Sequence, residues 1–156
     1  MKKIAFISFI FSIFIFASCA TNYRSSKTSL ELQSIQAKEF EANKDVTFAA
    51  TMSVFQDLGY SISSAEINTG LISAKSPTNH SNWNNDDTYT EATAFIEYFP
   101  TKKVTKVRLN FLSVRSFFAP FTTTRSRTDD VIDDLMIYQN AFSKIQEGIF
   151  IRTGTK

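Results

Sequence analysis

The stretch YTEATAFIEYFPTKKVTKVRLNFLSV, residues 89–114, contains two segments in which apolar and polar side chains alternate. Alternation of this kind places every second side chain on the same face of a strand. Pro100 and Thr101 mark the reversal between the two segments. The pattern predicts a long β-hairpin with one buried and one wet face, which is typical of an antiparallel sheet. The apolar face carries Ala92, Ala94, Ile96 and Tyr98 on the first strand and Val107, Leu109 and Phe111 on the second.

A helix is predicted ahead of this hairpin. Between residues 46 and 58, apolar side chains recur at helical spacing. Asn43 or Asp45 is suited to cap the start of this helix, and Gly59 is suited to the left-handed conformation that often ends one.

Shorter strands are predicted on both sides of that helix. Residues 35–41 predict a first strand, and residues 60–63 and 71–75 predict a hairpin that turns at 68–70. The segment 76–87 is polar and is expected to be a loop.

The carboxy-terminal part predicts a loop followed by the clearest helix of the chain. Residues 116–127 are expected to form the loop, and Thr128 is expected to cap the helix. Acidic side chains then suit the positive end of the helix dipole. These side chains are Asp129, Asp130, Asp133 and Asp134, and the apolar face that follows carries Val131, Leu135, Tyr138, Phe142, Ile145 and Ile149.

The order of these elements is strand, helix, hairpin, hairpin, helix. It predicts one α+β domain over residues 35–152, with an antiparallel sheet of about five strands and two helices packed on one face. With 156 residues, the chain has room for a single modest core.

The first residues have the three-part organisation of a secretory signal. Lys2 and Lys3 form a basic tip, an apolar run covers 4–16, and small residues precede Cys19. The segment FASC, residues 16–19, resembles the lipobox of bacterial lipoproteins.

This resemblance implies cleavage between Ser18 and Cys19 and fatty acylation of Cys19, such as by palmitate. The expected divisions are a signal peptide at 1–18 and a lipidated tether at 19–34. A plain secretory signal cut after Ser18 is the alternative. Ala20 and Thr21 stand where an inner-membrane retention signal usually carries Asp, which favours the outer membrane facing the periplasm.

Charge and cysteine content exclude several classes of function. Loss of Lys2 and Lys3 with the signal reduces 17 basic residues to 15, equal to the 15 acidic ones, so net charge predicts no binding to nucleic acid. Cys19 is the only cysteine and His80 the only histidine, so we expect no internal disulfide, no metal site and no cofactor. His80 is interpreted as a solvated loop side chain.

Two further segments resemble a group of small bacterial lipoproteins of unassigned function. One is VFQDLGYSISSAEINTGLISAK, residues 54–75, and the other is YQNAFSKIQEGIFIR, residues 138–152. The layout is also similar to the helix-grip domains of a lipoprotein subunit of the outer-membrane β-barrel assembly machinery. These motifs imply a fold and no chemistry, and likeness of fold alone is a weak guide to function.

The segment 115–127 is the candidate contact site. It combines basic and aromatic side chains, which would join charge steering with apolar burial if they are exposed. Its aromatic rings are otherwise interpreted as packing under the sheet. The residues are Arg115, Phe117, Phe118, Phe121, Arg125 and Arg127, and the basic stretch also includes Lys102, Lys103, Lys106 and Arg108.

Three classes of function follow from these observations. The first is a non-enzymatic, lipid-anchored module that binds another envelope protein. The second is a periplasmic carrier of an apolar or amphiphilic ligand, held in a cavity lined by phenylalanine. The third is a hydrolase with paired carboxylates, but the four Asp residues of 129–134 are better explained as charges at a helix start. We expect no enzymatic activity.

Overall fold

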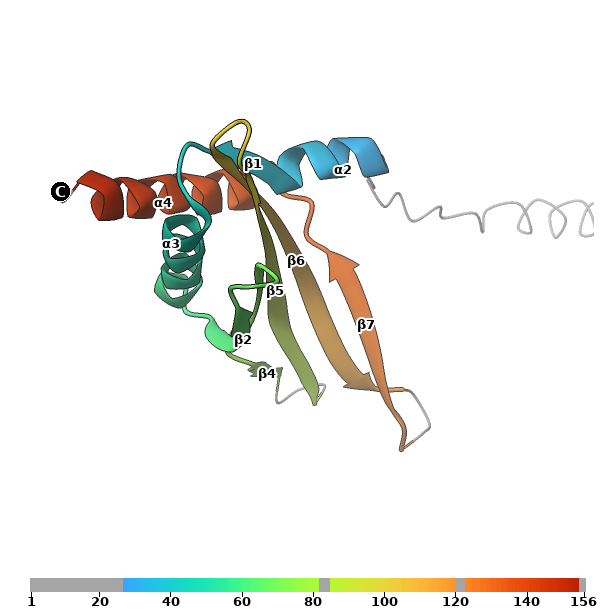
Figure 1. Ribbon diagram of the computed structural model, residues 1–156. Helices are drawn as coiled ribbons and strands as arrows, with labels where there is room; N and C mark the ends of the chain where they lie inside the picture. The colour runs from blue at the N-terminus through green and yellow to red at the C-terminus, as the bar shows by residue number, and fades with distance from the viewer. Residues whose placement is uncertain (1–26, 82–84, 120–122, 155–156) are drawn as a thin grey trace, which may run out of the picture.

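The computed structural model describes residues 27–81, 85–119 and 123–154. Within these ranges the chain forms three helices and seven strands (Figure 1). In chain order they are α2 (Ser29–Gln36), β1 (Ala37–Phe40), α3 (Lys44–Asp57), β2 (Ser61–Glu66), β3 (Leu71–Lys75), β4 (Asn79–Ser81), β5 (Asp86–Phe99), β6 (Val104–Phe118), β7 (Arg125–Val131) and α4 (Leu135–Gly154).

The strands form one antiparallel sheet in the order β1-β6-β5-β3-β2, with β4 added beside β5 and β7 added beside β6. The predicted α+β class, the antiparallel sheet and the long central hairpin are therefore confirmed. The hairpin is β5 and β6, which pair continuously from Asp87 opposite Ser116 to Phe99 opposite Val104. The expected count of about five strands was too low. β4 lies in a segment that was expected to be a loop, and β7 covers the end of the second predicted loop and the predicted first turn of the last helix.

The predicted first helix and first hairpin are also confirmed. The Asn43 side chain caps α3 by accepting a hydrogen bond from the backbone N–H of Val46 at 2.9 Å. Beyond the end of α3, Gly59 has φ +83°, the left-handed region that favours glycine. The hairpin of β2 and β3 follows, as its alternating residues predicted.

The chain ahead of β1 differs from the prediction. Residues 29–36 form α2, although they were assigned to the tether and the start of a strand. The cause is a capping box: the Thr28 side chain accepts from the N–H of Glu31, and the Glu31 carboxylate accepts from the N–H of Thr28 at 2.8 Å. The predicted strand is therefore confined to Ala37–Phe40.

The start of the last helix was also predicted too early. Thr128, Asp129 and Asp130 belong to β7, where Asp129 lies opposite Val114 of β6. Helix α4 begins only at Leu135, and Asp134 accepts a hydrogen bond from the N–H of Met136 at 2.8 Å. Asp134 is thus the acidic residue of this group seen to bond at the start of α4.

Helices α3 and α4 pack against each other and on the same face of the sheet, which we call the inner face. α2 is a third helix and packs beside α4 and β1. The inner face contributes alternate residues of β5 and β6 to the core, beginning with Ala92 and Phe111. Phe111 lies in an aromatic cluster, with ring centroids 5.3 Å from Tyr138 and 6.3 Å from both Phe55 and Tyr60.

Tyr138 joins this core to the amino-terminal helix. It is fully buried, its hydroxyl donates to the carbonyl of Ile132 at 2.8 Å, and it accepts from the Gln36 amide at 3.3 Å. Burial raises the pKa of the phenols of Tyr138 and Tyr60 above the ordinary value.

These raised pKa values predict loss of stability in alkali. An unfolded tyrosine releases its proton near pH ~10, whereas the folded one still holds it, so the free energy of unfolding falls as pH rises through that range. We expect Tyr138→Phe to lose less stability between pH ~8 and pH ~11 than the wild type. Urea unfolding at both pH values measures the difference, and Tyr60→Phe should act in the same direction. An equal loss in Tyr138→Phe and wild type would contradict this cause.

Candidate functional site

The central hairpin continues past the helices, and this part of the sheet contains most of the predicted contact residues. We call it the distal sheet: β4, β7, residues 86–91 of β5 and residues 112–118 of β6. In Figure 1 these strands extend down and away from α3 and α4. Because directly paired residues share a face, the registers assign each distal side chain to the inner face or to the opposite, outer face.

On the outer face, Arg127 connects three side chains. From β7 it donates to Glu91 at 3.1 Å and to the hydroxyl of Tyr89 at 3.3 Å, both on β5, and to Asp129 at 2.6 Å. The hydrogen bond to Asp129, together with the nearby charge of Glu91, raises the pKa of Arg127 above its ordinary value. The ammonium group of Lys75 lies 3.7 Å from the centroid of the Tyr89 ring.

The position of Arg127 also explains why Val114 is buried although it lies outside the main core. Val114 of β6 is 0% exposed, yet it lies on the outer face, opposite the helices. Its direct neighbours are Tyr89 on β5 and Asp129 on β7. Since Arg127 bonds to both neighbours, its side chain passes over Val114 and shields it from water.

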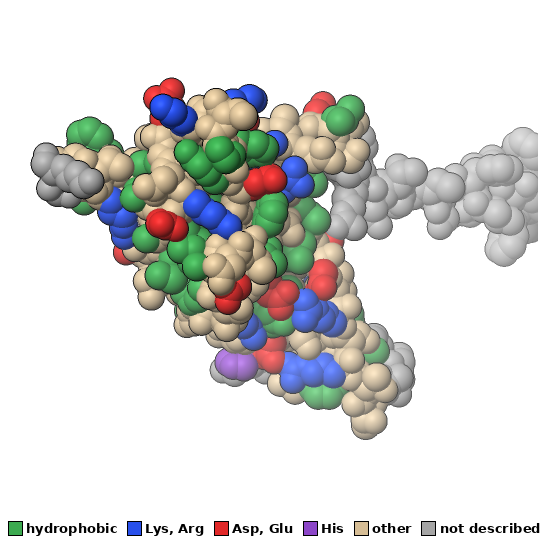
Figure 2. Space-filling model, in the orientation of Figure 1, with side chains coloured by type: hydrophobic (Ala, Val, Ile, Leu, Met, Phe, Trp, Pro, Cys, Tyr) green, Lys and Arg blue, Asp and Glu red, His purple; other side chains and the backbone are tan. Residues whose placement is uncertain are grey.

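A second charged group lies nearer the tip of the outer face. The Asp87 carboxylate accepts from Arg125 and contacts the imidazole of His80. Arg125 also donates to the hydroxyl of Ser116 at 2.8 Å, and its guanidinium lies 5.6 Å from the centroid of the Phe118 ring. Figure 2 shows acidic and basic side chains next to one another around the histidine at the lower end of the molecule.

The inner face of the distal sheet is polar instead of apolar. Arg115 donates to Asp86 through Nε at 3.0 Å and also through Nη2, and Asp86 is buried. The guanidinium of Arg115 lies 5.6 Å from the Phe117 ring centroid.

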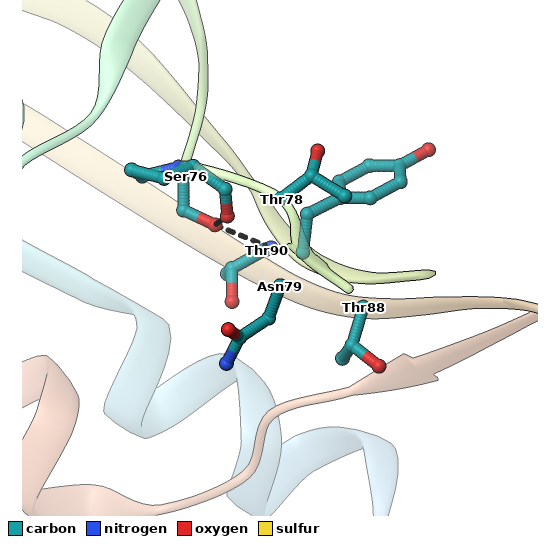
Figure 3. Close-up of a pocket in the computed structure, with 7 residues that line it drawn as sticks. Ser76, Thr78, Asn79, Thr88 and Thr90 are labelled. Atoms are coloured by element: carbon teal, nitrogen blue, oxygen red, sulfur yellow. Dashed lines mark hydrogen bonds between the residues drawn. The ribbon is translucent and has the colours of Figure 1, made fainter. Parts of the chain in front are cut away.

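A shallow hollow of about 330 Å³ lies close by. It is lined mainly by hydroxyl and amide side chains, among them Ser76, Thr78, Asn79, Thr88 and Thr90 (Figure 3). The hydroxyl of Ser76 accepts a hydrogen bond from the backbone N–H of Thr90 at 2.8 Å, which connects two segments that line the hollow. Such a lining offers uncharged hydrogen-bonding groups to a polar partner.

The described residues of the predicted contact site lie close together on β6 and β7, but they do not form a single loop. β6 continues to Phe118 and β7 begins at Arg125, so only 119–124 connects the strands. Strand alternation divides the described residues between the two faces. Arg115 and Phe117 are on the inner face, whereas Phe118, Arg125 and Arg127 are on the outer face.

The rings and the charges also differ from what was expected. Phe118 is exposed on the outer face, so the interpretation that the rings pack under the sheet is wrong for this residue. Phe117 is half-buried on the inner face and lies outside the core cluster. Arg115, Arg125 and Arg127 each have a carboxylate partner, so they do not form an unbalanced basic patch. The partners Asp86, Asp87 and Glu91 were missed, although the two Asp residues directly precede an alternating strand in the sequence.

Other predicted residues lie elsewhere. Cys19, Ser18 and Phe121 are outside the described residues. His80 was interpreted as part of a loop but belongs to β4, and its side chain is exposed. Lys106 and Arg108 lie near Phe95 at the other end of the outer face. Across the described ranges, no three His, Cys, Asp or Glu side chains are grouped as a metal site would require.

Taken together, the outer face of the distal sheet presents paired charged side chains beside aromatic rings. In the part of the chain that the structure describes, no helix has the length and apolar character needed to cross a membrane. Comparison with known protein families and with curated proteins gave no match.

Proposed function

We propose that this protein is a lipoprotein of the bacterial cell envelope that binds another envelope protein through its distal sheet and catalyses no reaction. The observation that carries the binding role is the outer face of that sheet. There, Arg125 is held by a carboxylate beside the exposed ring of Phe118, and Arg127 is held by a carboxylate beside the half-buried ring of Tyr89, away from the core. The main core lies on the opposite face of the sheet and does not include these side chains.

The proposed location rests on the sequence. The lipobox-like FASC follows the apolar run directly, and Cys19 precedes Lys27, the first described residue, by eight positions. An extended chain of that length spans at most about 30 Å. Acylation of Cys19 would therefore hold the domain close to the membrane surface, and Ala20 and Thr21 favour the outer membrane.

The architecture of the domain supports a role in the assembly of other envelope proteins. We propose that the domain is of the helix-grip type, because the long helix α4 shares its buried side chains with the core on one face of an antiparallel sheet. The likeness to the helix-grip domains of the β-barrel assembly lipoprotein is an analogy of architecture. This analogy favours a role among other envelope proteins. A role as a ligand carrier is less favoured, because buried side chains occupy the space between the sheet and the helices.

Lipidation is tested by metabolic labelling with a clickable fatty acid. We expect Cys19→Ser to carry no label, because the chain has no other cysteine to accept a diacylglyceryl group. Ser18→Ala is the matched control: it keeps a small residue before the cleavage site and should be labelled like the wild type. Undiminished label on Cys19→Ser would refute the lipoprotein assignment.

Partner binding is tested at the outer face of the distal sheet. Phe118→Ser combined with Arg125→Ser should abolish recovery of the partner when the protein is crosslinked in its native membrane and purified. The melting temperature should change little, because both side chains are exposed. Phe95→Ser is the matched control, since Phe95 and Phe118 are both 42% exposed on the outer face but only Phe118 lies in the distal sheet. Equal recovery with both variants would exclude the distal sheet as the binding surface.

A further inference from the structure

Exposed apolar side chains gather where the amino-terminal chain enters the domain. Lys27, the first described residue, lies beside the segment that leads into α4, because its ammonium group donates to the backbone carbonyl of Asp133. Large apolar side chains close to these two residues in the chain are exposed, and we call them the tether-exit patch. Its members are Leu30, Val131, Leu135, Met136 and Ile137.

The tether-exit patch is formed by two elements that lie next to each other. Leu30 of α2 is 76% exposed and Met136 of α4 is 69% exposed, and α2 packs beside α4. None of the five side chains belongs to the core cluster or packs against it. Apolar side chains that are grouped in this way on the surface are typical of a contact site.

The chain that leaves the tether-exit patch indicates which surface lies opposite it. Eight positions separate Lys27 from Cys19, the proposed site of lipidation, so the bilayer surface would lie within about 30 Å of the patch. The tip of the distal sheet is farther away, because Val131 and Arg125 are the two ends of β7, about 20 Å apart. Figure 1 shows α2 at the upper end of the sheet and the tip of the distal sheet at the lower end. A tether of this length therefore brings the patch to the bilayer more readily than the tip.

The charges beside the tether-exit patch indicate what kind of lipid contact it can make. Residues 27–31 and 131–137 contain one basic side chain, Lys27, and three acidic ones, Glu31, Asp133 and Asp134. Attraction to anionic lipid requires an excess of basic side chains, which these segments do not have. A contact with the bilayer would therefore depend on apolar burial and would form on neutral lipid.

We propose that the tether-exit patch is a membrane-contact surface, whose side chains enter the boundary between headgroups and acyl chains of the bilayer that holds Cys19. This proposal rests on the proposed lipid anchor and adds the orientation of the domain. Apolar side chains in contacts of this kind are buried about 5–10 Å into that boundary. The distal sheet would then extend away from the membrane, where it is accessible to another envelope protein.

Fluorescent probes at single positions of the lipidated full chain test this orientation. Leu30→Cys and Met136→Cys are each labelled with a thiol-reactive fluorophore and reconstituted into phosphatidylcholine vesicles whose acyl chains carry a nitroxide quencher. We expect strong loss of fluorescence at both positions, because both probes would lie in the bilayer boundary. Phe150→Cys is the matched control: Phe150 is 71% exposed on the same helix as Met136, but about 21 Å farther along it.

Quenching at Leu30 or Met136 that does not exceed quenching at Phe150 would overturn the membrane contact. A probe at Met136 whose emission is shifted to the blue without quenching would overturn it as well, because protein such as a second copy would then cover the patch.

The wild type separates this proposal from the proposed function, because its only cysteine is Cys19. If Cys19 carries the lipid, its thiol is blocked and the wild type takes up no fluorophore. Uptake by the wild type would refute the lipid anchor together with the membrane contact that rests on it. An unlabelled wild type with an unquenched probe at Met136 would leave the anchor in place and overturn the contact alone.

Removal of apolar side chains from the patch gives an independent measurement. In the Met136 probe variant, Leu30→Ser combined with Leu135→Ser should shift the equilibrium between quenched and unquenched probe at least about tenfold toward the unquenched state. Leu71→Ser combined with Phe95→Ser is the matched control, since these exposed side chains lie opposite each other on β3 and β5, outside the patch. Equal quenching in the two double variants would contradict apolar burial at the tether-exit patch.

Discussion

Replacing Gly70 by alanine is expected to destabilise the domain by roughly 3–5 kcal/mol, from strained backbone and overpacking together. Gly70 has φ +77°, and its carbonyl accepts from the N–H of Ile96 at 2.8 Å. A Cβ at this position would lie 2.1 Å from the carbonyl oxygen of Ile96, which is backbone and cannot rotate away. The turn between β2 and β3 would have to separate from β5.

Gly59→Ala is the matched control for that change. Gly59 has a similar positive φ of +83°, but a Cβ there would meet nothing within 4 Å. Its cost should be limited to the backbone preference, about 1–2 kcal/mol. Urea unfolding of both variants measures the difference, and equal losses would contradict the close approach of Gly70 to β5.

Replacing Phe111 by alanine is expected to cost about 3–5 kcal/mol, as large-to-small changes in cores do. The ring is 1% exposed and touches the rings of Phe55, Tyr60 and Tyr138, which come from different parts of the chain. Its loss would leave a cavity where the sheet meets α3 and α4. Thermal unfolding followed by circular dichroism should show a melting temperature lower by about 10 °C or more.

Phe95→Ala removes the same atoms from the neighbouring strand but from the outer face. Because that ring is substantially exposed, the cost should stay below about 1 kcal/mol. A comparable fall in melting temperature for both variants would mean that the core is not on the face where α3 and α4 pack.

The parts of the fold that could be predicted are those in which local pattern and tertiary environment agree. In β5 and β6, alternation such as Val107, Leu109 and Phe111 against Lys106 and Arg108 reports directly which face is buried. α3 was equally clear, because its cap and its terminal glycine both lie next to an apolar periodicity.

β7 could not be predicted from its own residues. Its sequence RSRTDDV has no apolar alternation, and four acidic residues close together are typical of a helix start. What holds this segment as a strand is pairing with the long edge of β6, helped by Arg125 and Arg127 reaching carboxylates on β5. Those contacts join residues distant in sequence, so no local pattern contains them.

The sequence predicted which residues would lie close together at the candidate site, but not how they are arranged. Basic and aromatic residues do gather near 115–127, but the assumption of a loop concealed that alternation sends Phe117 and Phe118 to opposite faces. α2 was missed although its signal was present, because Thr28 and Glu31 have the spacing of a capping box.

The mass of the intact protein, extracted from its native membrane in detergent, tests most directly the lipid anchor on which the proposed location depends. We predict a chain that starts at Cys19 and carries the added mass of a diacylglyceryl group together with an amide-linked acyl chain. A protein that starts at Met1, or one that starts at Cys19 with an unmodified thiol and amino group, would contradict the assignment as a lipid-anchored envelope protein.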